Sequence, residues 1–503
     1  MNKRHDLQDA VILAYDETTQ KPVGAYPDAS SRREHGNFCV VGPPGSGKGL
    51  WITTQLLNWR HSVVVVDLKG ETYARTAHYR RQLGQCVYVL DPRSGTGTRY
   101  NPVAAVDRAT WEQLAYEIMS QGVELRGEDN FWATSGVPLV LAVWLAAQAR
   151  QVPHIPLTVE VLGLGLAGII QSLLEHHPQD EEIMRYLAEF LGNDARSMNP
   201  EQLLNPSKLL DSKFASVVAA FKSFRNDNIL RIFSGHELYD IEGLFYEPAT
   251  IYVMADETNR QSFAAFLRLV MVSLGDSLIK HGDRTVYENR RPVLFLFDEF
   301  GRVQSNTVLT WLDTMRSRGI VLVLFIQKFS QVQVKGNWEE DENSIHHWII
   351  FKPTLSHARA GQFIVRNSGI TSVMVDSIES TSYNTHELST ASRSRALKER
   401  PVIRPEDIET WSSNTVYYVL SASRTTKNVA VGPTPWGVFG QSVAQQRMKP
   451  AALPPSLPAL VSYALPITRP APTQPQGARG QQRSTRPAPA YDLSTLDDPE
   501  IID

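Results

Sequence analysis

The loop GPPGSGKG, at residues 42–49, is the sequence feature that most limits the possible folds of this chain. An apolar stretch, NFCVV, precedes it, and GLWITTQLLNW follows it with the spacing of a helix. Glycines here let backbone amides approach phosphate oxygens, and a lysine supplies a compact positive charge. A strand, a glycine-rich loop and a helix in this order predict a phosphate-binding loop. A tight turn without a ligand is the alternative interpretation.

The loop positions predicted to bind a nucleotide are Gly42, Gly45, Ser46, Gly47, Lys48 and Gly49. We expect Lys48 to contact the β and γ phosphates. In such loops a Ser or Thr normally follows the lysine, and its hydroxyl joins the ligands of the Mg²⁺ ion. Gly49 stands there in this chain. The sequence therefore predicts a site that holds its metal through other ligands.

Continuous apolar stretches indicate strands that are buried on both faces, as in a parallel sheet. They are the valine run before Asp67 and the runs QCVYVLDP, ATIYVMAD, VLFLFDEF and GIVLVLFIQ. Between residues 104 and 238 the pattern changes to helices without obvious strands. We predict an α/β fold with a mainly parallel sheet and an inserted all-α domain.

The length of 503 residues predicts more than one domain, because single cores are several times smaller. We expect an N-terminal arm (1–35), a discontinuous nucleotide-binding domain (36–103 and 239–440) and the all-α domain (104–238). A Pro-rich, disordered tail (441–503) follows, because such a composition buries too little apolar surface to order itself. Its acidic end, YDLSTLDDPEIID, suits a docking peptide as well as a solubilising tail.

The composition is that of a globular protein, with 42% apolar and 20% charged residues. A net charge of −3 neither favours nor excludes nucleic acid, because an average can hide a basic channel. Cys39 and Cys86 lie in apolar runs, and we expect both to be buried thiols. The start of the chain lacks the apolar core of a signal peptide, and the apolar run near 137–149 is too short to span a bilayer. We therefore expect a cytoplasmic protein.

Two acidic residues, Asp298 and Glu299, end the run VLFLFDEF. Ligands bind at the carboxyl ends of parallel strands, so this pair is expected near the glycine-rich loop. Asp298 is the predicted Mg²⁺ ligand, through water, and Glu299 is predicted to orient the attacking water. Acidic residues also end many strands without such a role, and the prediction depends on the loop upstream.

Gln327 ends the next apolar run, and we predict that it contacts the γ-phosphate or the attacking water. A solvated strand end is the other interpretation. Just upstream, Arg316 and Arg318 are candidates for an arginine finger supplied across a subunit interface. A solvated helix end is the alternative for each arginine.

Six segments of the chain together resemble one family. They are GPPGSGKGL, VVVVDLKGETY, VYVLDPRSGTGTRYNPV, VLFLFDEFGRV, VLVLFIQKFSQV and RPVIRPEDIETWSSNTVYYVLSA. In this order, with a helical region between the halves, they look like the ATPase domain of type IV coupling proteins. These are the TraG/TraD-like DNA-translocating motors of bacterial conjugation and type IV secretion. The resemblance covers residues 36–435 and implies a RecA-like P-loop ATPase core.

The resemblance implies that the site binds ATP and Mg²⁺, and Gly after the loop lysine is familiar in this family. It implies that Lys48 binds phosphate, that Asp298 and Glu299 are the acidic pair and that Gln327 is the strand-end glutamine. Thr53 or Thr54, one turn along the helix, is a further candidate for assisting the metal. Asp67, Lys69 and Glu71 lie in the DLKGE motif, which follows the second strand.

The resemblance also implies a homo-hexamer that delivers single-stranded DNA, with its bound relaxase, to the channel components of a type IV secretion system. DNA would then contact channel loops through its phosphates, independently of base sequence. One candidate loop carries Arg393, Arg395, Lys398 and Arg400, for which a solvated surface is the alternative. A second class of function is a nucleotide-switched adaptor that selects protein substrates for secretion. An accessory protein is a possible partner of the acidic tail.

Most coupling proteins begin with a transmembrane module, whereas the first predicted strand here begins near residue 37. The sequence therefore predicts either a soluble member of the family or a truncated chain. In both cases we expect partners to recruit the protein to the inner membrane.

Overall fold

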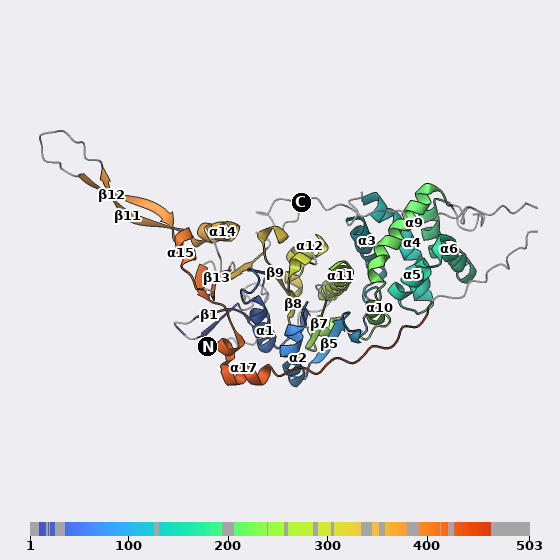
Figure 1. Ribbon diagram of the computed structural model, residues 1–503, viewed down its shortest axis with the longest axis horizontal. Coiled ribbons are helices and arrows are strands. Elements are labelled where there is room, and N and C mark those ends of the chain that lie inside the picture. Colours follow the sequence, from blue (N-terminus) through green and yellow to red (C-terminus); the bar gives the residue numbers. More distant parts are fainter. Residues whose placement is uncertain are drawn as a thin grey trace, which may run out of the picture. The chain divides into compact units, whose positions relative to one another are not determined.

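The computed structural model describes residues 10–16, 19, 21–25, 36–124, 130–193, 206–238, 240–255, 260–284, 290–302, 306–332, 345–351, 358–379, 392–412, 414–420 and 427–463. The chain divides into two compact units, Met1–Ala464 and Leu465–Asp503. The second unit lies outside the described residues, as does the acidic end that was predicted to dock a partner. All elements named below belong to the first unit (Figure 1).

A single sheet of 12 strands forms the centre of this unit, in the order β2-β1-β14-β13-β10-β3-β9-β8-β4-β7-β5-β6. The strands from β10 to β5 in this order run parallel, and antiparallel strands extend both edges. The predicted α/β fold with a mainly parallel sheet is confirmed. The strand bounds are β1 (Val11–Asp16), β2 (Lys21–Ala25), β3 (Phe38–Val41), β4 (Val63–Val66), β5 (Cys86–Asp91), β6 (Thr96–Gly97), β7 (Ala249–Val253), β8 (Val293–Phe297), β9 (Ile320–Ile326), β10 (His347–Phe351), β13 (Thr415–Leu420) and β14 (Lys427–Val431).

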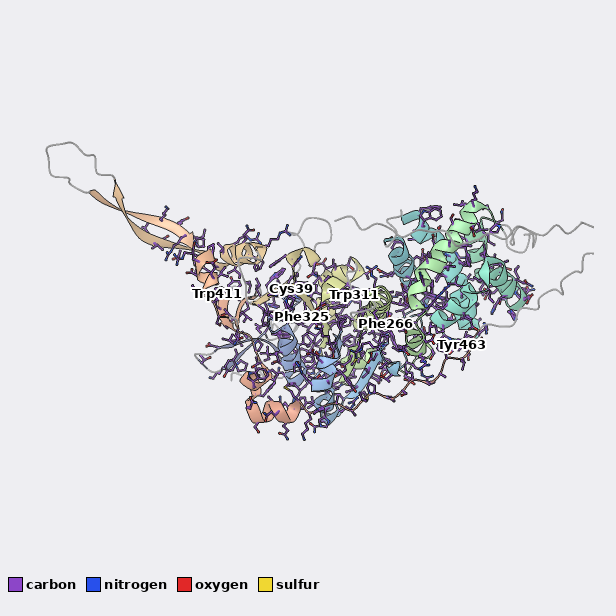
Figure 2. The ribbon with its side chains drawn as sticks, viewed as in Figure 1. Cys39, Phe266, Trp311, Phe325, Trp411 and Tyr463 are labelled. Carbon is purple, nitrogen blue, oxygen red and sulfur yellow. The ribbon has the colours of Figure 1, made fainter. Side chains whose placement is uncertain are left out.

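Alternate residues of the parallel strands enter two separate apolar cores. In β3, Cys39 and Val41 belong to one core, whereas Phe38 and Val40 belong to the other. Figure 2 labels Cys39 and Phe325, one member of each core. Both faces of the sheet are therefore covered, which explains why these strands are continuous apolar runs in the sequence.

Helices cover both faces of the sheet. α1 (Lys48–Asn58) and α2 (Glu71–Gln82) contribute Trp51 and Tyr73 to one core. α11 (Arg260–Arg284) and α12 (Asn306–Thr314) contribute Phe266 and Trp311 to the other. The remaining short elements are η4 (Glu242–Phe245), η5 (Phe300–Arg302), η6 (Arg316–Arg318), η7 (Phe329–Val332), α14 (Ala358–Ser368), α15 (Pro405–Glu409), α16 (Pro435–Phe439) and α17 (Gln441–Arg447).

Arg80 is fully buried and ties α2 to its neighbours. Its guanidinium donates hydrogen bonds to the hydroxyl of Thr250 at 2.7 Å and to the carbonyls of His61 at 2.6 Å and Leu56 at 3.2 Å. Burial lowers its pKa to about 10. A buried cation is tolerated because these acceptors replace water, and the result is a fixed position for α2 beside α1 and β7.

The region between β6 and β7 forms helices, and its described residues include no strand, as predicted. These helices form one group in cyan to green in Figure 1. The sheet and these helices belong to one compact unit. The predicted boundaries between the nucleotide-binding domain and the all-α domain therefore stay a prediction. The bounds are α3 (Arg108–Glu124), α4 (Asn130–Ala149), α5 (His154–Leu162), α6 (Gly165–His176), α7 (Glu181–Leu191), α9 (Lys208–Phe221), η3 (Lys222–Phe224) and α10 (Asp227–Phe233).

Helix α4 is longer than the apolar run that the sequence indicated. Among the described residues, its window Phe131–Ala149 is the one helix segment long and apolar enough to cross a membrane, contrary to the expectation from residues 137–149. However, 72% of that window is buried inside the structure. α4 packs against α3, α5, α7 and α9. Its apolar composition is thus explained by a central position among these helices.

The N-terminal residues do not form a separate arm where they are described. β1 pairs with β14, with Tyr15 opposite Val431, and β2 pairs with β1. The side chain of Gln55 in α1 exchanges hydrogen bonds with the backbone of Ile12 at 2.9 and 2.7 Å. These bonds satisfy the backbone groups of an added edge strand, and they extend the sheet beyond the predicted boundary at residue 36.

The beginning of the predicted disordered tail is also structured. Residues 441–447 form α17, and residues 448–463 follow as an extended segment. The N–H of Gly97 donates to the carbonyl of Pro455 at 2.8 Å, and that of Leu457 donates to the carbonyl of Gly95 at 3.1 Å. A Pro-rich stretch has few N–H donors but retains its carbonyls, so it can pair with a strand edge.

The two cysteines differ from each other. Cys39 is fully buried in β3, as predicted, and burial raises the pKa of its thiol. Cys86 is exposed, contrary to the prediction. It begins β5, where the strand has not yet entered the core.

Candidate active site at the glycine-rich loop

The predicted phosphate-binding loop turns tightly between β3 and α1. Gly45 and Gly47 have φ angles of +75° and +98°, which only glycine adopts without strain. A Cβ atom on Gly42 would lie 2.6 Å from Oγ of Ser46 and 2.9 Å from Cβ of Phe351. The spacing of the glycines thus follows from the backbone path of the loop.

Lys48 begins α1, and its ammonium group folds back over the loop. It donates hydrogen bonds to the carbonyls of Gly42 and Pro43, the latter at 3.0 Å. Burial lowers the pKa of Lys48, and the negative charges of Asp298 and Glu299 oppose this shift. A cation beside the N-terminal amides of a helix attracts phosphate groups.

Asp298 and Glu299 follow β8 and line the same pocket as Lys48. Burial, together with the negative charges of Glu299 and Asp67, raises the pKa of Asp298 to about 7, and the positive charge of Lys48 opposes this shift. Glu299 has a φ of +55°, in the left-handed region that a residue with a side chain seldom occupies. Strain of this kind persists where the surrounding structure holds it, and it is common at active sites.

The DLKGE segment after β4 forms another wall of the pocket. Asp67 is buried, and its Oδ2 accepts a hydrogen bond from the backbone N–H of Tyr73 at 2.7 Å. This bond orients the carboxylate at the start of α2. Glu71 pairs with Arg75 at 3.2 Å, and Lys69 lines the pocket.

Gln327 follows β9. The neighbouring parallel strands β3, β9, β8 and β4 thus all place residues at their carboxyl ends, on the same side of the sheet. The backbone N–H of Gln327 donates to Oε1 of Gln331 at 2.6 Å, which fixes the turn after the strand. The pocket on this side, here called the phosphate pocket, has a volume of about 370 Å³. The predicted site residues that line it are Gly45, Ser46, Gly47, Lys48, Gly49, Asp298, Glu299 and Gln327, and the DLKGE motif adds Asp67, Lys69 and Glu71.

Arg316 and Arg318 lie on the opposite side of the sheet, where the parallel strands begin. They form η6, which precedes β9, whereas the pocket lies where the parallel strands end. Arg316 contacts Nε2 of His346, and Arg318 donates to the carbonyl of Thr314 at 2.7 Å. Neither arginine lines the pocket of its own chain, so a role as arginine finger requires a second subunit.

Thr53 and Thr54 do not assist a metal in this arrangement, contrary to the expectation. Both are fully buried in α1 and neither lines the pocket. Their hydroxyls donate to the carbonyls of Gly49 and Leu50, each at 2.8 Å. A buried helical threonine satisfies its hydroxyl in this way, on the carbonyl four residues earlier.

The basic run predicted to contact DNA lies on β12 (Ser392–Pro401), which pairs with β11 (Ile370–Glu379) in a separate two-stranded sheet. The side chains of Lys398 and Arg400 are exposed. Those of Arg393 and Arg395 lie outside the described side chains. The run is therefore on a hairpin apart from the phosphate pocket.

A second pocket, of about 340 Å³, also borders the loop, and sequence reasoning missed it. It shares Ser46, Gly47 and Leu50 with the phosphate pocket. The one signal in the sequence was an aromatic residue among turn formers, in GPTPWG at 432–437. Nothing in the sequence places that residue beside the loop. That residue is Trp436, and further side chains of this wall come from distant segments: Tyr15, Phe351 and Asn414.

The residues of the phosphate pocket fit a nucleotide phosphate and Mg²⁺. In the described part of the chain, the hydroxyl of Ser46 is buried without a hydrogen-bond partner. Over the same residues, no group of three or more His, Cys, Asp or Glu side chains is arranged to hold a metal by itself. A Mg²⁺ ion would take Asp298 as its ligand from the protein and complete its oxygen shell with phosphates and water, which is its usual behaviour in nucleotide sites.

Residues 3–420 match the family described as type IV secretory system conjugative DNA transfer. The conjugal transfer protein TraG of Agrobacterium fabrum (strain C58) is 24% identical over 390 residues, which are 72% of this chain and 56% of TraG. A TraG of Escherichia coli is 22% identical over 404 residues, which are 73% of this chain and 60% of that protein. The chain thus spans less than two thirds of the length of these relatives.

Solved structures of the plasmid coupling protein TrwB share the fold. The unbound conjugative coupling protein TrwBdeltaN70 superimposes with a TM-score of 0.55 at 13% identity, over 84% of this chain and 87% of that chain. TrwB in complex with ADP and Mg²⁺ superimposes with a TM-score of 0.53 at 13% identity, over 79% and 84%. At this identity the likeness shows the fold alone.

The family match covers most of the chain, and the solved coupling-protein structures share the fold that the residues predicted. The resemblance to type IV coupling proteins is confirmed on these grounds. The chain belongs to the family of conjugative DNA transfer proteins of type IV secretory systems.

Proposed function

We propose that this protein is an ATP-driven coupling protein that delivers single-stranded DNA and its bound relaxase to a type IV secretion channel. One observation carries the proposal: three neighbouring parallel strands, β3, β8 and β9, bring Lys48, Asp298, Glu299 and Gln327 to one pocket. A pocket with a phosphate-binding lysine, an acidic pair and a strand-end amide is equipped for phosphoryl transfer to water. Membership of the conjugative DNA transfer family supports DNA as the cargo.

The roles of the pocket residues follow from their chemistry. Lys48 and the loop amides bind the β and γ phosphates, and Asp298 holds Mg²⁺, which neutralises developing charge on the phosphates. Glu299 orients and polarises the attacking water, and Gln327 contacts the γ-phosphate or that water. Structures of TrwB in complex with ADP and Mg²⁺ and with a non-hydrolysable ATP analogue support these ligands.

The proposed assembly is a homo-hexamer in which Arg316 or Arg318 completes the site of a neighbouring subunit. Their distance from the pocket of their own chain supports a role in trans. Mixing two inactive variants tests this. Subunits with Lys48→Ala retain the arginines, and subunits with Arg316→Ala and Arg318→Ala retain the loop. Mixed rings should regain part of the ATPase activity, whereas a finger acting within one chain predicts no recovery.

Stimulation of ATPase activity by DNA tests the motor function itself. ATP turnover of the full chain should rise when single-stranded DNA is added, and the stimulation should fall with salt because phosphate contacts dominate. Replacing Lys398 and Arg400, which are exposed on β12, should weaken that stimulation while leaving the basal rate unchanged. A rate that DNA does not change favours the second candidate, a nucleotide-switched adaptor for protein substrates.

The proposed location is the cytoplasmic side of the inner membrane, with recruitment by channel components. An accessory protein at the acidic C-terminal end is part of the same proposal. Co-sedimentation with inner-membrane vesicles, with and without the channel components, measures the recruitment.

A further inference from the structure

The second pocket beside the loop adjoins the phosphate pocket, and the two share part of their lining. Both are lined by Ser46, Gly47 and Leu50, at the start of α1. A ligand with phosphates on one side of these residues can therefore extend across them into the second pocket. Its volume of about 340 Å³ lies in the range of small-molecule sites.

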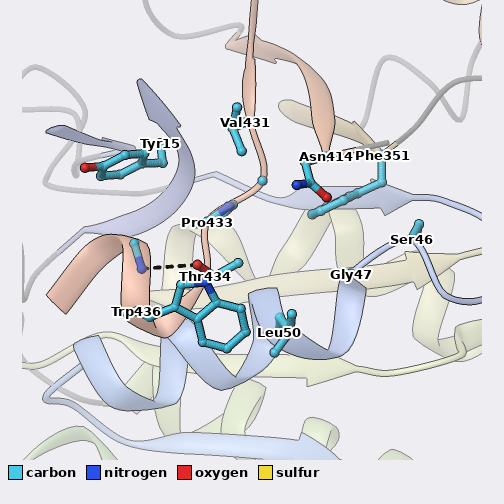
Figure 3. Close-up of a pocket in the computed structure, with 12 residues that line it drawn as sticks. Tyr15, Ser46, Gly47, Leu50, Phe351, Asn414, Val431, Pro433, Thr434 and Trp436 are labelled. Atoms are coloured by element: carbon cyan, nitrogen blue, oxygen red, sulfur yellow. Dashed lines mark hydrogen bonds between the residues drawn. The ribbon is translucent and has the colours of Figure 1, made fainter. Parts of the chain in front are cut away.

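Aromatic side chains form much of the second pocket (Figure 3). Tyr15 comes from β1, Phe351 ends β10, and Trp436 belongs to α16. Phe351 is buried, with its ring 3.8 Å from the position that a Cβ on Gly47 would take. Trp436 is 45% exposed, which is unusual for so large an apolar side chain. Aromatic faces around an open space suit the stacking of a heterocyclic base.

Hydrogen bonds hold the segment that carries Trp436. The N–H of Gly432 donates to the carbonyl of Asn414 at 2.8 Å. The N–H of Gly437 donates to the hydroxyl of Thr434 at 3.1 Å, the dashed line in Figure 3, and this bond caps α16. The aromatic wall is thus fixed to the end of β14 and to the start of β13, which preorganises it for a ligand.

One polar side chain of the pocket can distinguish the two purines at their N7 edge. Asn414 presents an amide with a donor and an acceptor, and asparagine pairs with adenine through both. Guanine offers two acceptors on the same edge and satisfies only the donor. We propose that the second pocket, from here on the base pocket, binds the adenine base of the nucleotide whose phosphates occupy the phosphate pocket. This inference rests on the nucleotide site proposed above.

Two ligands separate base binding from phosphate binding. The dissociation constants of ATP and of inorganic tripolyphosphate, each with Mg²⁺, are measured by calorimetry for the full chain. Removing one stacked aromatic weakens base binding by about 5- to 150-fold. Trp436→Ala should raise the Kd of ATP within that range and leave the Kd of tripolyphosphate unchanged. Trp436→Phe keeps an aromatic face and should retain most of the ATP affinity.

A matched control is Phe131→Ala, which removes an aromatic residue that is 52% exposed in the helical region. It should change neither dissociation constant. Equal losses for ATP and tripolyphosphate in Trp436→Ala would show that the tryptophan only supports the loop, and would overturn the proposal. An unchanged ATP affinity overturns it as well. None of these titrations depends on DNA-stimulated turnover, so a failure of the motor function is recognised separately.

The choice of adenine has its own test. The parent protein should bind ATP more tightly than GTP, and Asn414→Ala should bring the ratio of the two dissociation constants toward one. A parent protein that binds both equally, or an unchanged ratio in the variant, would overturn adenine selectivity.

Discussion

The phosphate pocket and the base pocket share Ser46 and Gly47 of the loop and Leu50 of α1, but they are built on different principles. Short contiguous motifs at the ends of β3, β4, β8 and β9 supply the phosphate pocket. The base pocket combines Tyr15 of β1, Phe351 at the end of β10, Asn414 just before β13 and Trp436 of the short helix α16. The first depends on backbone path and charge, and the second on the packing of segments far apart in the chain.

This difference predicts how each pocket responds to substitution. Phosphate binding needs positive φ at Gly45 and Gly47 and a cation at Lys48, and few other residues supply these. Base stacking needs only a flat apolar face, which several side chains provide. We therefore expect severe and specific losses in the phosphate pocket and graded losses in the base pocket.

The largest effect is expected for Lys48→Ala. The variant loses the cation that binds the β and γ phosphates, so ATP turnover should fall by about 10³-fold, together with nucleotide affinity. ATPase assays and nucleotide titration measure both, and circular dichroism checks that the chain remains folded. A folded variant with the affinity and turnover of the parent would contradict the assignment of the loop.

Glu299→Gln should slow hydrolysis by about 10²-fold while ATP binding remains. The amide keeps the shape of the side chain and the unusual backbone conformation, but it no longer polarises water. Single-turnover assays separate binding from chemistry. If the variant hydrolyses ATP at the parent rate, the catalytic role lies elsewhere, and Gln327 is the next residue to replace.

Sequence reasoning found the phosphate pocket because each of its elements is local. The loop glycines and the Asp298–Glu299 pair follow apolar runs, and the ends of parallel strands share an edge whatever their order. The base pocket depends on the order of strands in the sheet, which apolar periodicity does not give. Tyr15 fell in a predicted arm because pairing of β1 with β14 is a long-range contact.

Two other sequence-based predictions were wrong because they also depended on specific contacts between distant residues or on the orientation of one side chain. The composition of residues 448–463 predicted disorder, but the carbonyl of Pro455 pairs with the N–H of Gly97. Composition reports average burial and says nothing about one specific backbone pair. Thr53 is one turn from the loop, yet its position on α1 turns it into the core, where its hydroxyl bonds to Gly49.

A smaller and more selective effect is expected for Gly432→Ala. Its new Cβ would lie 2.9 Å from Cε1 of Phe351 and 3.4 Å from Cγ1 of Val416, so the wall of the base pocket must shift. Overpacking of this kind costs about 1 kcal/mol. If restoring the binding shape of the wall costs the complex that amount, the ATP affinity falls by about 5-fold. Tripolyphosphate affinity should not change.

The control for this comparison is Gly42→Ala, in the loop itself. Its Cβ would lie 2.6 Å from Oγ of Ser46 and would displace the phosphate-binding backbone. Both ligands should then bind more weakly. If the two glycine variants affected ATP and tripolyphosphate in the same proportion, the distinction between the pockets would fail.

The smallest effect is expected for Gly49→Thr, at the position where the loop departs from the usual pattern. Gly49 lies in the first turn of α1, its φ is not positive, and no atom lies within 4 Å of the place that its Cβ would take. A threonine is therefore accommodated without strain. Its hydroxyl would offer the Mg²⁺ ion a ligand at the loop position that Ser or Thr usually fills, which Thr53 and Thr54 do not replace because their hydroxyls are bonded within the helix.

We expect Gly49→Thr to lower the Mg²⁺ concentration that gives half-maximal ATPase activity. The decrease is about 3-fold if the new ligand stabilises the bound metal by about 0.7 kcal/mol, which is a typical net contribution of one hydrogen bond. Gly49→Ala is the matched control, because it makes the same change to the backbone and adds no hydroxyl. Its Mg²⁺ midpoint should equal that of the parent. If both variants shifted the midpoint equally, the effect would come from a stiffer first turn of α1. If neither shifted it, Asp298, the phosphates and water already complete the metal's shell, and glycine at position 49 costs the site nothing.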